Sequence, residues 1–144
     1  MIPLPASVDD LAAVVELLQK CGRPHDDLTP GHMRDFLVIP ADGELAACAG
    51  LEVFGSDALL RSLAVLSPLR LQGVGKALCG ELEQRARENG VNTLYLLTTD
   101  AEAYFAKRGY RRCTREEVPA AVKTSAEFTA LCPSSCPCMY KKLV

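Results

Sequence analysis

Residues 65–78 read VLSPLRLQGVGKAL, and they join an apolar run to a helical pattern through two glycines, Gly73 and Gly75. A helix that begins directly after such a turn presents unpaired backbone N–H groups and the positive end of its dipole. These groups bind phosphate where glycine leaves the backbone accessible. The stretch therefore predicts either an anion-binding turn or a plain strand-to-helix turn, and the flanking segments must distinguish the two.

The composition is typical of one soluble globular domain, which we expect to span residues 1–144. The chain is 49% hydrophobic and 24% charged, with a net charge of −2 at pH 7. Lys and Arg form no cluster, so we expect no nucleic-acid partner. No run has the length of a membrane span and the N-terminus lacks a signal-peptide pattern, so we expect no membrane association and a cytoplasmic location. The seven cysteines, odd in number and irregularly spaced, are expected to be free thiols.

Upstream of the glycine turn, the pattern predicts a helix, a loop and three antiparallel strands. Ser7 and Asp10 form a capping-box pattern, and the helix is expected to end near Cys21. The polar stretch 23–35 is expected to be a mobile surface loop with one helical turn. The runs FLVI, ELAACAGLEVF and ALLRSLAVL, separated by short turn sequences, predict an antiparallel meander.

Downstream, the pattern alternates between helix and strand. An apolar stripe after Gly75 predicts a helix that ends at Asn89-Gly90, and TLYLL predicts the next strand. Thr99 and Glu102 predict a capped second helix, followed by the strand YRRC. The tail predicts a helix over 119–131 and a last strand near CMYKKLV. The glycine turn thus follows a strand where antiparallel pairing changes to parallel, which is where open α/β sheets bind ligands.

Two phosphate-binding motifs are excluded by single residues. A Walker loop needs a hydroxyl after Gly-Lys, and Ala77 stands there. A dinucleotide fingerprint needs a third glycine, and Leu78 occupies its place.

The pattern that fits is R-x-x-G-x-G over residues 70–75, after a strand ending LAV and before the segment FAKRGY. In these features the sequence resembles the GNAT acetyltransferases. The resemblance implies an α/β GNAT fold, in which a mixed central sheet has antiparallel N-terminal strands and parallel motif strands splayed around acetyl-CoA. It implies acetyl-CoA as the co-substrate and no required metal.

The same resemblance assigns the cofactor-binding residues. Main-chain groups of Leu63 and Val65 would pair with the pantetheine arm, and Arg70 would add charge. The backbone N–H groups that would hold the pyrophosphate belong to Leu71, Gln72, Gly73, Val74, Gly75 and Lys76. The alternative for Arg70 and Lys76 is a solvated surface pair.

The catalytic residues are less clearly marked. Many family members protonate the leaving thiolate with a tyrosine four residues before the helix-ending glycine, and here that position is Phe105. The neighbouring Tyr104 is the candidate acid, although one helical residue turns it by about 100°; the alternative is that both rings only pack. Glu52 is the candidate general base because family members place a carboxylate on these strands, and its alternative is a solvent-facing side chain.

Arg61 interrupts the apolar run LLRSLAVL and shares a strand face with Leu63 and Val65. A charge at such a position should be paired. Either it meets an internal carboxylate such as Glu52, or it binds an acidic acceptor. By resemblance, the loop that carries His25, Asp26, Asp27 and His32 would border the acceptor pocket.

The finer pattern, including LLTTDAEAYFAKRGY and a cysteine-bearing tail, resembles small acetyltransferase-like proteins of arsenic-resistance operons. We expect an N-acetyltransferase for a small amine acceptor that is amino-acid-like or arsenic-related, and the sequence leaves room for a homodimer. The alternatives are a CoA-binding module without catalysis and a thiol-based arsenical or metal binder. For the latter, the soft ligands would be Cys132, Cys136 and Cys138, although free thiols are the simpler interpretation.

Overall fold

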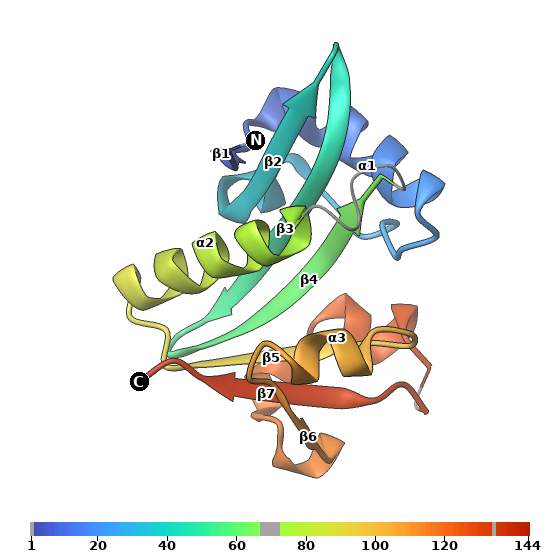
Figure 1. Cartoon of the computed structure of the whole chain (residues 1–144). Helices are drawn as coiled ribbons and strands as arrows, with labels where there is room; N and C mark the ends of the chain where they lie inside the picture. The colour runs from blue at the N-terminus through green and yellow to red at the C-terminus, as the bar shows by residue number, and fades with distance from the viewer. Residues whose placement is uncertain (1, 67–72, 134) are drawn as a thin grey trace. The chain divides into compact units, whose positions relative to one another are not determined.

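The computed structural model describes residues 2–66, 73–133 and 135–144. Within these residues seven strands hydrogen-bond in the order β1-β2-β3-β4-β5-β7-β6, and Figure 1 shows them with the helices. The strands are β1 (Leu4–Pro5), β2 (Phe36–Ala41), β3 (Glu44–Phe54), β4 (Asp57–Val65), β5 (Thr93–Leu97), β6 (Arg111–Cys113) and β7 (Cys138–Lys142). The helices are α1 (Leu11–Lys20), α2 (Val74–Glu88), α3 (Glu102–Ala106) and α4 (Ala120–Lys123).

The sheet is mixed, as the sequence predicts. The β1–β2, β2–β3, β5–β7 and β6–β7 pairs are antiparallel. The pair β4–β5 is parallel over three residue pairs, from Asp57↔Thr93 to Leu59↔Tyr95. The predicted change of pairing at this point of the chain is confirmed.

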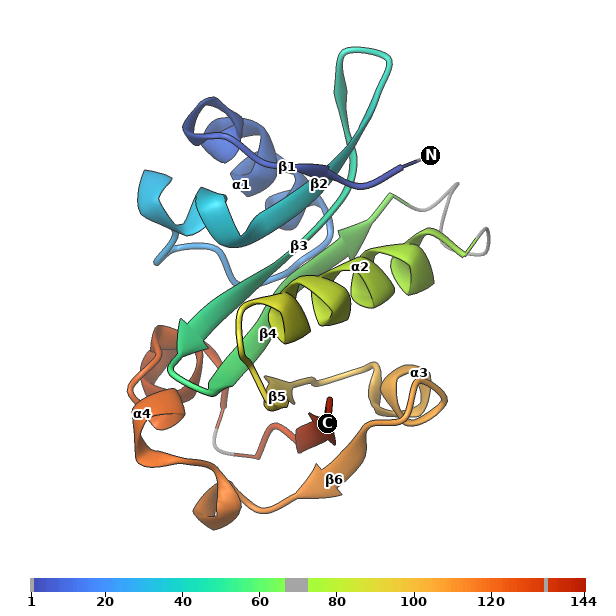
Figure 2. The ribbon, with the colours of Figure 1, turned by 90° about the vertical axis from the view of Figure 1, so that its left-hand side faces the viewer.

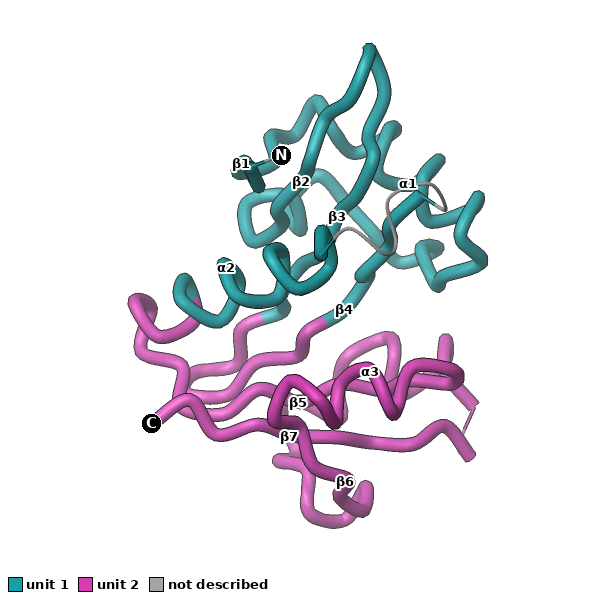
Figure 3. Tube along the Cα trace, in the orientation of Figure 1, with its two compact units in different colours: residues 1–52, 61–85 teal, residues 53–60, 86–144 magenta. Residues whose placement is uncertain are grey.

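The chain divides into two compact units (Figure 3). One unit comprises residues 1–52 and 61–85, and the other comprises residues 53–60 and 86–144. The expected single domain over 1–144 stays a prediction.

The core of the first unit forms where α1 packs beside the strands β2 and β3 (Figure 2). Val14, Leu17 and Leu18 of α1 are almost fully buried against residues that include Phe36 and Cys48. The predicted capping box is present, because the Ser7 amide donates to the Asp10 carboxylate at 2.7 Å; it caps a 3₁₀ turn, Val8–Asp10, that leads into α1. Burial of this apolar stripe holds α1 on the sheet.

The segment 23–35 contains the predicted helical turn, but it is not a surface loop throughout. It ends in a 3₁₀ helix, Pro30–Asp35, whose Met33 is completely buried. Asp27 from the same segment is hydrogen-bonded to Arg61 on β4. Long-range contacts of this kind leave no mark in the local sequence pattern, which shows only turn formers and mixed charge.

The hairpin between β2 and β3 turns through Asp42 and Gly43, which have φ angles of 49° and 85°. Two consecutive positive φ values define the turn that matches the twist of antiparallel strands, and Asp-Gly is typical of it. This predicted turn is confirmed.

The second unit has its own apolar cluster, built from Leu59, Val118, Val122 and Cys138. The helix predicted over 119–131 is confirmed only in part, because the segment divides into α4 and a π-helical turn, Glu127–Leu131. At the break, Thr124 Oγ1 donates to the Ala121 carbonyl oxygen at 2.6 Å. Such side-chain bonds to the backbone compete with a regular helix.

The predicted capping box of Thr99 and Glu102 is also wrong. The Ala101 amide donates instead to Thr98 Oγ1 at 2.9 Å, and α3 begins at Glu102. Adjacent threonines carry the same capping group, so the sequence alone does not distinguish them.

No helix in the described ranges combines the length and apolar character needed to cross a membrane.

Candidate active site

The glycine turn leads into the N-terminus of α2 with the geometry that an anion-binding site requires. Gly73 has a φ of 75° and is exposed, and a Cβ built on it would meet nothing within 4 Å. The Ala77 amide donates to the Gly73 carbonyl oxygen at 3.0 Å. The amides of Val74, Gly75 and Lys76 therefore precede the first i→i−4 bond and have no acceptor within the helix. Arg70, Leu71 and Gln72 lie outside the described residues.

The strand before the turn presents the two residues predicted to pair with pantetheine. Leu63 and Val65 are both half-buried on β4. The Val65 carbonyl oxygen accepts a weak bond from the Cys21 thiol at 3.8 Å. Their role in binding CoA stays a prediction.

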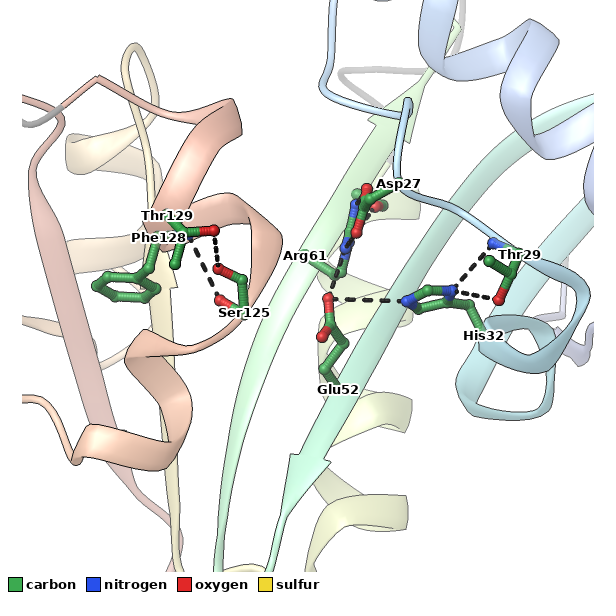
Figure 4. Close-up of polar contacts among 9 residues, drawn as sticks. Asp27, Thr29, His32, Glu52, Arg61, Ser125, Phe128 and Thr129 are labelled. Atoms are coloured by element: carbon green, nitrogen blue, oxygen red, sulfur yellow. Dashed lines mark hydrogen bonds and ion pairs between the residues drawn. The ribbon is translucent and has the colours of Figure 1, made fainter.

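Arg61 lies at the centre of an ion-pair cluster on the β3 and β4 strands (Figure 4). Its Nη1 donates to Asp27 Oδ2 at 2.6 Å and to Glu52 Oε1 at 2.5 Å. Its Nη2 donates to Asp27 Oδ1 at 2.8 Å, which makes the Asp27 contact bidentate. Of the two alternatives for Arg61, the structure thus contains the internal pairing with Glu52.

The Arg61 side chain has no exposed surface, while those of Asp27 and Glu52 are 16% and 17% exposed. Contact of Arg61 with an acceptor carboxylate would therefore require one of the two carboxylates to give way. The substrate-binding role of Arg61 and the general-base role of Glu52 stay predictions.

A strained residue holds the guanidinium in place. Ser62 has a φ of 60° in the middle of β4, a conformation that costs an L residue about 1–2 kcal/mol. Its Oγ accepts from Arg61 Nε at 2.9 Å, and its carbonyl oxygen accepts from the buried Cys48 thiol at 3.3 Å. Strain of this kind persists where surrounding contacts fix the backbone.

His32 extends the cluster on the Glu52 side. Its Nδ1 accepts from the Thr29 amide at 3.0 Å, so in the neutral ring the proton is on Nε2. Nε2 faces Glu52 Oε1 at 4.0 Å. The ligand atoms of Asp27, His32 and Glu52 lie within 4.8 Å of one another. Arg61 already provides the cation between the two carboxylates, so the arrangement is that of an ion-pair network.

The cluster predicts acid sensitivity. Burial alone would raise the pKa of Asp27, but the hydrogen bonds and charge of Arg61 outweigh it and hold the pKa below the ordinary 3.8. A lowered pKa adds stability that is complete above the unfolded-state value and is lost as the pH falls through the folded-state value. The melting temperature should therefore drop more steeply below about pH 4 in the wild type than in Asp27→Asn. Parallel melting curves from pH 7 to pH 2 would contradict this.

Tyr104, the candidate acid, and Phe105 lie on α3 in the second unit. Phe105 is 5% exposed, and its ring packs edge-on against Tyr104 and Tyr110 at 5.3 and 5.5 Å between ring centroids. The Arg108 guanidinium lies 3.7 Å from the Tyr104 ring centroid. Both aromatic rings thus have packing partners, which are compatible with a purely structural role.

Tyr104→Phe separates the two roles because it removes only the hydroxyl. We expect turnover to fall by much less than the roughly hundredfold loss that removal of a positioned acid causes. Steady-state kinetics with the best acceptor measure this, and Arg108→Lys controls for the cation on the ring. A hundredfold loss with unchanged CoA affinity would make Tyr104 the acid.

Comparison with known proteins decides the family. The model of the acetyltransferase (GNAT) family matches residues 10–113. This chain belongs to the GNAT acetyltransferase family. The match spans α1, the strands around the Arg61 cluster, the glycine turn and α3.

Curated relatives include the amino-acid acetyltransferase of Pseudomonas putida strain GB-1. It is 35% identical over 124 residues, and the match covers 81% of this chain and 29% of that protein. An uncharacterized N-acetyltransferase of Chlorobaculum tepidum is 34% identical over 89 residues, which cover 61% of this chain and 57% of that protein. The chain thus spans less than a third of the amino-acid acetyltransferase that it matches.

Solved structures support the fold. The N-acetylglutamate synthase of Neisseria gonorrhoeae, in complex with coenzyme A and N-acetyl-glutamate, superposes with a TM-score of 0.81 at 23% identity. That match covers 99% of this chain and 35% of the synthase. A Mycobacterium tuberculosis protein in complex with CoA gives a TM-score of 0.82 at 22% identity, with complete coverage of both chains. The predicted GNAT fold is confirmed.

Proposed function

We propose that this chain transfers the acetyl group of acetyl-CoA to the amino group of a small, amino-acid-like molecule. The observation that carries the proposal is the exposed Gly73 turn followed by three α2 amides, in a chain of the GNAT family. The open space at Gly73 lets a diphosphate approach the backbone, and the helix N-terminus favours its charge. These features fit the CoA diphosphate.

In the proposed reaction, a neutral amine attacks the thioester carbonyl carbon. A C–N bond forms, the C–S bond breaks, the amine loses a proton and the thiolate gains one. Glu52 is the proposed proton acceptor, directly or through a water, and Tyr104 or solvent supplies the other proton. Backbone groups of Leu63 and Val65 would orient the pantetheine arm.

The relatives are the reason for proposing an amino-acid-like acceptor. The P. putida relative is an amino-acid acetyltransferase, and the gonococcal structure holds N-acetyl-glutamate. An arsenic-related acceptor rests only on the sequence resemblance of LLTTDAEAYFAKRGY and the cysteine-bearing tail. A cytoplasmic location and a homodimer likewise stay predictions of this proposal.

A screen of amino acids and their arsenic and phosphorus analogues tests the proposal. Acetyl-CoA and CoA should be separated by chromatography, because the seven protein thiols react with thiol-specific dyes. We expect at least one amino acid to accelerate CoA release above the acceptor-free rate. If the protein binds CoA but no amine accelerates CoA release, a CoA-binding module without catalysis is favoured. Phe105 also favours this alternative, because many family members have a proton-donating tyrosine at its position.

A further inference from the structure

A pair of cysteines lies outside the acetyl-transfer site and has no part in the proposed reaction. Cys113 on β6 and Cys138 on β7 face each other as paired residues of the two strands. The Cys113 thiol donates to Cys138 Sγ, and the two sulfur atoms are 3.3 Å apart. Because the strand register fixes both side chains, the two thiols are held together before any ligand binds.

The pair opens onto a cavity. Cys113, Cys136 and Cys138 line a space of about 260 Å³ together with Arg112 and Arg115. Cys138 is 3% exposed, and Cys113 is half-buried and offers the more accessible sulfur. The Arg115 guanidinium is fixed beside the pocket, because its Nη2 donates to the Pro133 carbonyl oxygen at 2.7 Å.

The trio Cys132, Cys136 and Cys138, which the sequence marks as soft ligands, does not converge. Among the described residues, the one group of three metal-type ligands within 4.8 Å is Asp27, His32 and Glu52. The structure instead pairs Cys132 with Cys136 through a side-chain hydrogen bond, and it pairs Cys138 separately with Cys113. This partner was missed because the two cysteines are 25 residues apart and only strand pairing joins them.

The thiols are protonated at neutral pH. Burial raises the pKa of Cys138 to about 12 and also raises that of Cys113. Each sulfur is therefore a weak nucleophile alone, because the thiolate is the reactive form. A ligand that removes both protons as it binds both sulfurs is suited to this pair.

We propose that Cys113 and Cys138 form a dithiol site for a trivalent thiophilic centre, of which a monosubstituted trivalent arsenical is the representative. With sulfur bonds of about 2.3 Å, a 3.3 Å sulfur separation corresponds to a bond angle of about 90° at the bound atom. A tetrahedral zinc site needs a wider angle of about 109°. A pyramidal centre with three bonds accepts the narrower angle.

The binding step involves no oxidation or reduction. An arsenical R–As(OH)₂ loses two As–O bonds, and the two thiols lose their S–H bonds. Two As–S bonds form and two water molecules leave. This site is independent of acetyl transfer, so the failure of either proposal leaves the other standing.

The test uses the full chain, reduced with a phosphine and mixed with phenylarsine oxide. Intact-mass spectrometry should show one phenylarsenic group in place of two hydrogen atoms, with a raised melting temperature. Cys113→Ser and Cys138→Ala each leave one As–S bond in place of two, so each should weaken binding of the arsenical by about 100-fold or more. Cys113 is half-buried, so Cys113→Ser should fold, and it tests the site even if Cys138→Ala does not fold.

Two control variants keep both Cys113 and Cys138 and should bind phenylarsine oxide as the wild type does. Cys48→Ala removes a buried thiol whose pKa is likewise raised to about 12, and Cys132→Ala removes a thiol of the tail. Undiminished binding in Cys113→Ser would overturn the proposal. So would a loss of binding confined to Cys132→Ala, because the site would then lie at the other tail cysteines.

Discussion

Gly75→Glu is expected to weaken CoA binding by at least about tenfold. The substitution places a carboxylate among the Val74, Gly75 and Lys76 amides, where it repels the diphosphate and competes for the same donors. An acidic residue in the first turn of a helix is otherwise favourable, but Gly75 is buried, so the fold of the variant must be checked. Calorimetric titration with CoA measures the loss, and circular dichroism checks the fold.

Two further variants on the same helix make this result decisive. Lys76→Glu replaces a positive charge by a negative one at an exposed position, a change of two charge units, and should also weaken binding. Gly80 is exposed with open space around it, so Gly80→Ala should leave CoA affinity unchanged and raise helix stability by about 1 kcal/mol. Native affinity in both glutamate variants would place the CoA site elsewhere.

Arg61→Ala is expected to destabilise the protein by about 3–5 kcal/mol. The substitution leaves Asp27 and Glu52 as two neighbouring, largely buried carboxylates without their shared cation. Arg61→Lys should cost less, because it keeps the charge but loses the fork that reaches Asp27, Glu52 and Ser62 together. Chemical denaturation measures both free energies of unfolding.

Lys20→Ala serves as the control because it removes only exposed ion pairs, with Glu16 at 3.2 Å and with Glu44 at 3.7 Å, which solvent screens and which should contribute little to stability. In the double variant Arg61→Ala, Asp27→Asn, part of the lost stability should return, since one abandoned charge is gone. A cost for Arg61→Ala no larger than that of Lys20→Ala would show that the cluster is not a structural unit.

Some members of the Arg61 cluster could be predicted from the sequence, and others could not. Alternation along β4 indicated a buried charge that needed a partner, and Glu52 on the adjacent strand was within the expected set. Asp27 was not identifiable as the bidentate partner, because it lies 34 residues away in a segment without periodicity. The positive φ of Ser62 left no signal either, since serine carries no preference for that conformation.

Short sequence motifs predicted the structure correctly where one backbone conformation is strongly preferred by the residues present. Asp42-Gly43 and the Gly73 turn need positive φ values, and their sequences are typical of such turns. The helix predicted over 119–131 is interrupted near Thr124, whose side chain bonds to the Ala121 carbonyl oxygen, a competition that apolar periodicity does not register.

The most direct test of acetyl transfer is the mass of the acceptor after incubation with acetyl-CoA that carries a deuterated acetyl group. We expect the amino group of an amino acid to gain the deuterated acetyl with the wild-type protein, and Gly75→Glu to reduce this product at least about tenfold. An acceptor that stays unlabelled while the protein binds acetyl-CoA would contradict acetyl transfer by this chain.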